Sequence, residues 1–233
     1  MVTPPVPAAT LILVRDGRRG LEVLLGRRSD RAAFGGVHVF PGGLVEELDH
    51  RSDVPAVGGS EPDRPFQVAA VRETAEEVGL FVVDGPVPPG AMGTAGAELF
   101  AALAATGIRF DLDRLSFVSN WVTPEAAPRR FDTRFFVARG DDLPPPVALT
   151  GELADPVWVR PGDALGRAET EEWRIVLPTR KHLEMLEGFS DAETAIAGLA
   201  STASRKRTIP RVVRTGSEVR AVLPGDPGYE EAE

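Results

Sequence analysis

The segment Phe66–Val78 constrains the fold of this chain more than any other, because its apolar spacing is that of an amphipathic helix. Asp63 can cap such a helix, Pro65 suits its first turn and Gly79 suits its end. At 3.6 residues per turn, one face is an apolar stripe made by Val68, Val71, Ala75 and Val78. The opposite face carries three carboxylates, those of Glu73, Glu76 and Glu77. We therefore expect this helix to bury one side in a core and to concentrate negative charge on the other.

The rest of the chain mixes strands and helices. Strands are predicted at Ala8–Val14, Leu21–Arg27, Val37–Phe40, Phe81–Val83, Leu115–Val122, Phe131–Ala138 and Pro156–Arg160. Further helices are predicted at Ala91–Thr106, Pro178–Glu187 and Asp191–Ala200, and a terminal hairpin at Val212–Arg214 and Val219–Leu223. The polar stretches His50–Pro65 and 141–151 indicate loops. Because the two kinds of element do not alternate strictly, the pattern favours an α+β fold with a mixed sheet.

Length and composition indicate one globular domain. The chain has 233 residues, of which 42% are hydrophobic. We expect residues 8–223 to form this domain, with flexible ends at 1–7 and 224–233. Cysteine is absent, which excludes disulfides and thiolate zinc sites. No apolar run is long enough to span a bilayer, no secretory signal is evident, and the net charge of −9 disfavours bulk nucleic-acid binding, so we expect a cytoplasmic protein.

The three glutamates on one helix face suggest a metal site. Like charges at spacings of three and four residues cost a few tenths of a kcal/mol each, and a bound Mg²⁺ would turn that cost into binding because it prefers carboxylate oxygen. The alternative is the solvated acidic face that any surface helix presents. The helical pattern alone does not decide between the two.

The surrounding residues add a resemblance. The nine residues Arg-Glu-Thr-Ala-Glu-Glu-Val-Gly-Leu from Arg72 to Leu80, preceded by the turn 41–43 (Pro-Gly-Gly), resemble the signature of the Nudix hydrolases. Thr74 stands where that signature has an aliphatic residue, and Asp49 stands where it has a glutamate. Gly43 and Arg72 are 29 positions apart, against 14 in the uninterrupted signature, so 15 residues are inserted, at about 50–65. An insertion confined to a loop is expected to cost little.

This resemblance implies a Nudix-type α/β/α sandwich and an Mg²⁺- or Mn²⁺-dependent attack of water on a nucleoside diphosphate linked to another group. By the same likeness, the metal is held by Glu73, Glu76 and Glu77, with Gly43 allowing close approach of the backbone. Arg72 would orient a glutamate through a charge-assisted hydrogen bond. The general base is either Glu77 or Glu152, and Glu152 is otherwise a loop carboxylate in solvent.

The substrate class is suggested by other segments. The residues from Val23 to Ser29 and from Gly35 to Gly43, together with 121–125 and 129–136, are similar to coenzyme A diphosphatases of the Nudix family. The long box insertion is similar to the branch that contains the mammalian peroxisomal acyl-CoA diphosphatases. Candidate phosphate contacts are Arg27, Arg28, Arg129, Arg130 and Arg134, each of which could instead be solvated or lie at the edge of the core. His38 is expected to be a packed structural histidine.

Three functions remain open at this point. The first is a diphosphatase that cleaves coenzyme A or acyl-CoA to 3′,5′-ADP and a phosphopantetheine. The second keeps the chemistry but acts on ADP-ribose, NADH, a dinucleoside polyphosphate or a nucleoside triphosphate. The third is a non-catalytic module that binds a nucleotide. A small-molecule nucleotide is the expected partner in each case, and the family likeness also suggests a homodimer.

Overall fold

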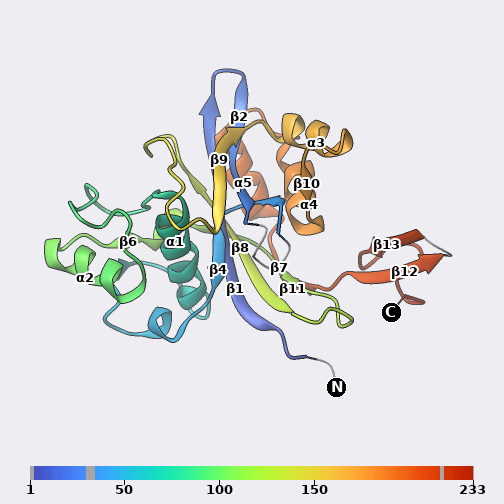
Figure 1. Cartoon of the computed structure of the whole chain (residues 1–233), viewed down its shortest axis with the longest axis horizontal. Coiled ribbons are helices and arrows are strands. Elements are labelled where there is room, and N and C mark those ends of the chain that lie inside the picture. Colours follow the sequence, from blue (N-terminus) through green and yellow to red (C-terminus); the bar gives the residue numbers. More distant parts are fainter. Residues whose placement is uncertain (1–2, 30–34, 216–217, 233) are drawn as a thin grey trace.

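A large mixed sheet organises the chain. The computed structural model describes residues 3–29, 35–215 and 218–232 (Figure 1). The nine-stranded sheet has the order β10-β3-β2-β1-β8-β7-β11, with β4 paired to β1 and β9 paired to β2. Its strands are β1 (Val6–Gly17), β2 (Gly20–Arg28), β3 (Val37–Val39), β4 (Gly42–Leu44), β7 (Ser116–Val122), β8 (Phe131–Arg139), β9 (Leu153–Val159), β10 (Arg174–Ile175) and β11 (Ser204–Thr208).

Helices cover both faces of this sheet. In Figure 1, α1 (Arg64–Val78) and α2 (Gly96–Thr106) lie to the left of it, and α3 (Pro161–Glu169), α4 (Leu177–Leu186) and α5 (Ala192–Ser201) lie to the right. Successive side chains of β1 point alternately to the two faces of the sheet. Leu11 and Leu13 pack in the apolar cluster that contains α1. Ile12 and Val14 belong to the cluster with the other three helices. The molecule is therefore the α+β sandwich expected from the sequence.

Smaller elements complete the fold. Two short 3₁₀ helices adjoin the inserted segment. One, η1 (Glu47–His50), leads into it, and Asp113 of the other, η2 (Leu112–Arg114), accepts from the N–H of Gly59 at 3.0 Å. Within that segment β5 (Ala56–Val57) pairs with β6 (Phe110–Asp111). A separate hairpin is formed by β12 (Arg211–Thr215) and β13 (Glu218–Val222), and Figure 1 shows it extending from the body beside the C-terminus. Residues 216–217, at its predicted turn, lie outside the described residues. No helix among the described residues has the length and apolar character needed to cross a membrane.

The helix predicted at Phe66–Val78 is confirmed, and Asp63 occupies its N-cap position. Pro65 lies in the first turn, and Gly79 ends the helix in the left-handed conformation (φ +66°), with its N–H donating to Ala75. The side chain of Asp63 makes no capping hydrogen bond. The backbone of Asp63 is already helical (φ −87°, ψ −17°), and its carboxylate forms ion pairs with Arg134 and Arg205 of the sheet instead.

Some observed element boundaries differ from the predicted ones, because an apolar segment forms a strand only where another strand pairs with it. The predicted strand Phe81–Val83 is wrong, because Phe81 is buried without a partner strand and only Val83 forms an isolated bridge, to Phe110. β1 begins at Val6, two residues earlier than predicted, because Val6 and Pro7 pair with β8. The helix predicted from Ala91 begins at Gly96.

Helix α3 and strand β11 were not predicted, because their sequences carry weak local signals for a helix or a strand. Helix α3 contains two glycines, Gly162 and Gly166, and β11 is the exposed sequence Ser-Arg-Lys-Arg-Thr, which has no apolar alternation. In the C-terminal stretch expected to be flexible, the hydroxyl of Tyr229 donates to the carbonyl of Ile209 at 2.8 Å. Its ring also lies under the guanidinium of Arg211.

Candidate active site

The site is built where α1 crosses β4. Gly42 adopts φ +153°, a conformation that glycine permits, and its N–H donates to Oε2 of Glu77 at 3.0 Å. The neighbouring Gly43 faces the first glutamate so closely that a Cβ atom there would overlap the carboxylate of Glu73. Glycine at both positions therefore allows the backbone to lie directly against two of the three α1 carboxylates.

Arg72 is the centre of a buried ionic cluster. Its side chain is 2% exposed, and its Nε and Nη2 donate to the two oxygens of Asp49 at 2.8 and 2.9 Å. Nη1 donates to Glu73 at 2.9 Å and to Glu76 at 3.3 Å. Nη2 also donates to the carbonyl of Leu44 at 2.9 Å. Burial disfavours the charged guanidinium, but the bonds to Asp49 and the neighbouring carboxylates outweigh this and raise the pKa of Arg72. Asp49 thus acts as the buried partner of Arg72 despite its shorter side chain.

Two of the three glutamates are held in surroundings that disfavour their charge. Burial raises the pKa of Glu73 to about 7, although the charge of Arg72 opposes the rise. Burial also raises the pKa of Glu77 to about 8, against the opposing effect of the Gly42 N–H. The third, Glu76, accepts from Arg72 and, at 2.7 Å, from the backbone N–H of Gly96. Added positive charge at this place would therefore be strongly favourable.

These carboxylates suit a hard divalent cation in their chemistry. Within the described residues, no three acidic or histidine side chains already converge on one point, because Glu73 and Glu76 turn toward Arg72 and Glu77 toward Gly42. Three carboxylates beside an accessible glycine backbone are nevertheless the oxygen donors that Mg²⁺ and Mn²⁺ prefer. The donor set fits such an ion, provided that the carboxylates exchange their present partners for it.

Two further predicted residues lie beside Glu77. Strands β2 and β9 pair so that Arg28 is opposite Leu153, and the N–H of Ser29 donates to the carbonyl of Glu152 at 2.8 Å. The charge of Arg28 lowers the pKa of Glu77 and that of Glu152 raises it, each as a smaller effect than burial. Arg28 and Glu152 are thus close enough to Glu77 for their charges to act on it. On the same strand, Arg27 forms an ion pair with Asp155 at 3.4 Å.

The predicted arginines at 129, 130 and 134 have other surroundings. Arg129 lies over the ring of Phe131. Arg130, for which a phosphate contact and a place at the edge of the core were both open, is buried and donates to the carbonyls of Thr123 and Thr3. Arg134, for which the same two roles were open, forms an ion pair with Asp63 at 2.5 Å. Both guanidiniums are used within the chain, because residues of the inserted and N-terminal segments meet β8 there.

The predicted structural histidine is found in a packed position. His38 on β3 is buried and stacks on Trp173, with ring centroids 3.9 Å apart and planes 9° from parallel. Burial, together with the charge of Arg27, lowers the pKa of His38. Its ring therefore has the surroundings of a neutral core side chain.

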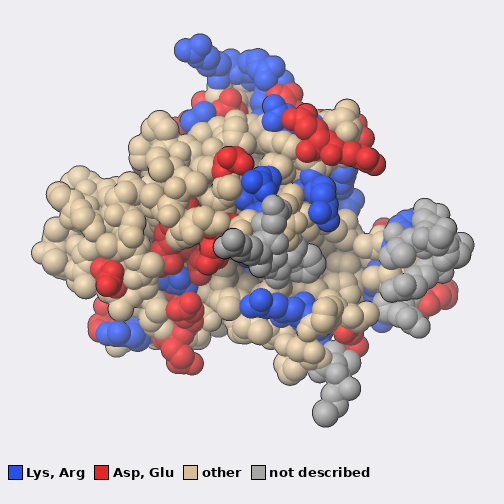
Figure 2. Space-filling model, viewed as in Figure 1, with Lys and Arg blue, Asp and Glu red and all other residues tan. Residues whose placement is uncertain are grey.

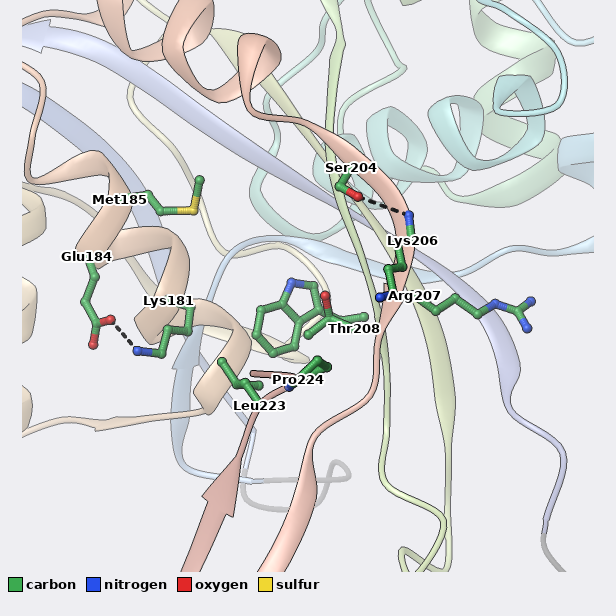
Figure 3. Close-up of a pocket in the computed structure, with 10 residues that line it drawn as sticks. Lys181, Glu184, Met185, Ser204, Lys206, Arg207, Thr208, Leu223 and Pro224 are labelled. Carbon is green, nitrogen blue, oxygen red and sulfur yellow. Dashed lines mark hydrogen bonds and ion pairs between the residues drawn. The ribbon is translucent and has the colours of Figure 1, made fainter. Parts of the chain in front are cut away.

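The charge distribution and the pockets add context. Figure 2 shows acidic side chains gathered over α1, with basic side chains to the right of them on the same face. A separate pocket of about 630 Å³ lies between α4 and β11, away from the α1 carboxylates (Figure 3). Trp121 and Met185 line it, and so do Lys181 and Lys206, the two lysines of the chain.

Comparison with known proteins decides the family. The model of the NUDIX domain matches residues 4–178. The chain belongs to the Nudix hydrolase family. A crystal structure of a NUDIX hydrolase from Alicyclobacillus acidocaldarius is similar to this one with a TM-score of 0.75 and 35% identity, covering 84% of this chain and 97% of that one.

Curated relatives of this Nudix domain are more distant. The nudix hydrolase 7 of Caenorhabditis elegans is 28% identical over 79% of this chain, which spans 61% of that protein. The acyl-coenzyme A diphosphatase NUDT19 of Gallus gallus is 27% identical over 90% of this chain and 73% of its own length. The NUDT19 of Homo sapiens is 26% identical over 91% of this chain and 73% of its own length.

Sequence reasoning missed the partners that hold the predicted residues in place. The carboxylate of Asp63 and the guanidinium of Arg205 are 2.5 Å apart although 142 positions separate the two residues in the chain. The backbone N–H of Gly96, which binds Glu76, follows a loop that had been predicted as helix. The sequence signal for the Asp63–Arg205 pair is the basic run from Arg205 to Arg207. This run does not indicate which carboxylate it will meet.

Proposed function

We propose that this chain is a Nudix diphosphatase that uses Mg²⁺ or Mn²⁺ to hydrolyse a nucleoside diphosphate linked to another group. The observation that carries the proposal is the contact of Glu73 and Glu77 with the Gly42–Gly43 backbone, where burial raises the pKa of both carboxylates. Glu76 lies on the same helix and shares the guanidinium of Arg72 with Glu73. When bound, the ion supplies charge that offsets the diphosphate and lowers the pKa of the attacking water.

The residues of the chain have separate roles in this proposal. Glu73, Glu76 and Glu77 hold the ion beside the backbone of Gly43, and Arg72 keeps Glu73 and Glu76 in place by hydrogen bonds. The oxygen of water bonds to one phosphorus as the anhydride P–O bond breaks. Either Glu77 or Glu152 accepts the proton that this water loses, and the leaving phosphate takes the electron pair of the broken bond. Arg27, Arg28 and Arg129 are the candidates for binding the phosphates.

Coenzyme A or acyl-CoA is the substrate that we propose, with 3′,5′-ADP and phosphopantetheine or its acyl derivative as products. Two relatives that carry the name acyl-coenzyme A diphosphatase support this choice, and so does the inserted segment between Asp49 and α1. ADP-ribose, NADH, dinucleoside polyphosphates and nucleoside triphosphates are the alternative substrates. A cytoplasmic location and a homodimer belong to the same proposal.

The test is a substrate panel with the purified full chain. Coenzyme A, an acyl-CoA, ADP-ribose and NADH are incubated with Mg²⁺ or Mn²⁺, with and without EDTA, and the products are identified by mass spectrometry. We expect 3′,5′-ADP from the coenzyme A species and its loss with EDTA. Good turnover of ADP-ribose with none of any coenzyme A species would refute the proposed substrate.

A pair of matched variants tests whether the site is catalytic. Loss of an outer partner of a metal ligand costs about 10- to 100-fold, so we expect Glu76→Gln to lose at least about 100-fold in kcat/KM. Glu98→Gln, which changes an exposed glutamate of α2, is expected to behave as wild type. Equal activity of wild type and Glu76→Gln on every substrate would favour the non-catalytic module. The general base is the one of Glu77 and Glu152 whose glutamine variant loses the acidic limb of the pH profile.

A further inference from the structure

The N-terminal end of α1 is held by an ionic cluster that the metal-site residues do not include. The carboxylate of Asp63 is 2% exposed, and each of its oxygens forms an ion pair with a different arginine. Oδ1 lies 2.5 Å from Nη1 of Arg134 on β8, and Oδ2 lies 2.5 Å from Nη1 of Arg205 on β11. A buried carboxylate with two cations is favourable only while both remain in place, because its charge has lost the solvation of water.

Aromatic rings extend the same cluster. The guanidinium of Arg134 lies 3.6 Å from the ring centroid of Phe66, in the first turn of α1. The guanidinium of Arg205 lies 4.6 Å from the ring centroid of Phe117 on β7. Arg134 also donates to the carbonyl of Pro62 at 2.9 Å. The cluster therefore joins the end of the inserted segment, the start of α1 and three strands of the sheet.

The strand that supplies Arg205 lies beyond the residues that match the NUDIX domain. That match ends at residue 178, and β11 spans Ser204–Thr208, where it pairs in parallel with β7. The inserted segment is likewise extra to the uninterrupted signature. Two additions to the basic domain thus meet at one buried carboxylate, ten residues before Glu73 on α1.

We propose that Asp63 and Arg205 form a positioning latch, through which the C-terminal strand β11 fixes the start of α1 and so the placement of its metal-binding carboxylates. This inference rests on the metal-binding role proposed for α1. A continuous helix transmits a change at Asp63 over about 15 Å to Glu73, since its rise is 1.5 Å per residue. Neither latch residue touches the ion or the substrate.

Neighbouring residues of β11 provide a matched control. The side chain of Arg205 is 59% exposed and that of Arg207 is 62% exposed, so substitution of either is compatible with folding. Arg207 forms an ion pair with Asp132 of β8 at 2.8 Å and makes no ion pair with α1 among the described residues. Arg205→Gln and Arg207→Gln therefore remove the same charge from the same strand, but only the first acts on the latch.

Direct Mn²⁺ binding, followed by electron paramagnetic resonance without substrate, gives a readout independent of activity. We expect Arg205→Gln to weaken Mn²⁺ binding about fivefold, Arg207→Gln to change it less than twofold, and Arg205→Lys to restore most of the loss. Asp63→Asn combined with Arg205→Gln is expected to be no worse than Asp63→Asn alone, because both remove the same interaction. Equal effects of the two glutamine variants, or unchanged Mn²⁺ binding in Arg205→Gln, would overturn the proposal.

Hydrogen exchange separates failure of the latch from failure of the metal site. The amide of Gln67 donates to the carbonyl of Asp63, so peptides covering the first two turns of α1 report on the latch. We expect faster exchange there in Arg205→Gln, with no change in α4 or in the Arg207→Gln variant. If wild type bound no Mn²⁺, the proposed metal site would fail, and unchanged exchange in α1 would in addition refute the latch.

Discussion

The buried pair between Arg72 and Asp49 has an exposed counterpart with the same geometry. In both pairs Nε and Nη2 of the arginine bond to the two oxygens of an aspartate, at 2.8 and 2.9 Å for Arg72–Asp49 and at 2.8 and 2.5 Å for Arg51–Asp53. The difference is burial, since the side chain of Asp49 is 0% exposed and that of Asp53 is 66% exposed. Substituting each aspartate by asparagine thus measures what burial contributes.

The expected loss for Asp49→Asn follows from what Arg72 retains. Removing one partner of a buried ion pair costs about 3–5 kcal/mol, because the other charge stays buried without its counterion. Arg72 keeps Glu73, Glu76 and the carbonyl of Leu44, so we expect the lower end of this range, about 3 kcal/mol. For a chain of this length, that corresponds to a fall in Tm of about 6–12 °C. Asp53→Asn is expected to lie within error of wild type.

Urea unfolding measures both variants, provided that the slope of free energy against urea concentration is unchanged. A fall in the midpoint for Asp49→Asn but not for Asp53→Asn is the expected result. If the two variants lost the same stability, burial would not be the source of the strength of the Arg72 cluster. If Asp49→Asn left the stability unchanged, Glu73 and Glu76 alone would be enough to balance the buried charge of Arg72.

Three further outcomes are expected. Gly43→Ala should lower Mn²⁺ affinity by at least about tenfold, measured by calorimetry, because its methyl group would displace the carboxylate of Glu73. Saturating Mn²⁺, at about 100 times its Kd, should add about 2.7 kcal/mol to the free energy of unfolding, and EDTA should reverse this in a thermal melt. Burial lowers the pKa of His182 to about 4, below its unfolded value of 6.5, so its stabilising effect is present above pH 6.5 and is lost as the pH falls toward 4. Urea titrations should show a loss of about 3 kcal/mol over that range, and His182→Gln should reduce it.

The sequence predicts helix α1 well because the determinants of that helix are local. Pro65 and Gly79 mark its ends, and the spacing of Glu73, Glu76 and Glu77 places them together on any helix. The strands with strong β-branched content, such as β1, are likewise found within two residues of their predicted start. For this helix and this strand, the signals lie within about ten residues, and the expectation and the structure agree.

The arginines show why the rest could not be predicted. A guanidinium binds any carboxylate or carbonyl that the fold brings near, so the role of Arg134 depends on Asp63, which is 71 positions away in the chain. Arg130 is satisfied by the carbonyl of Thr3, 127 positions away. Phe81 shows the same limit for strands, since an apolar run becomes a strand only if a partner is within hydrogen-bonding distance.

The inserted segment illustrates how a signature can be interrupted without loss of its geometry. Its first end is fixed by Asp49 against Arg72, and its last end is fixed by Asp63 against Arg134 and Arg205. Between two fixed ends, extra residues cost only the entropy of a longer loop, which rises by about 0.6 kcal/mol for each doubling of length. The length of the segment can therefore vary while α1 stays in place, whereas we expect exchange of either aspartate at its ends to disturb the helix that carries the glutamates.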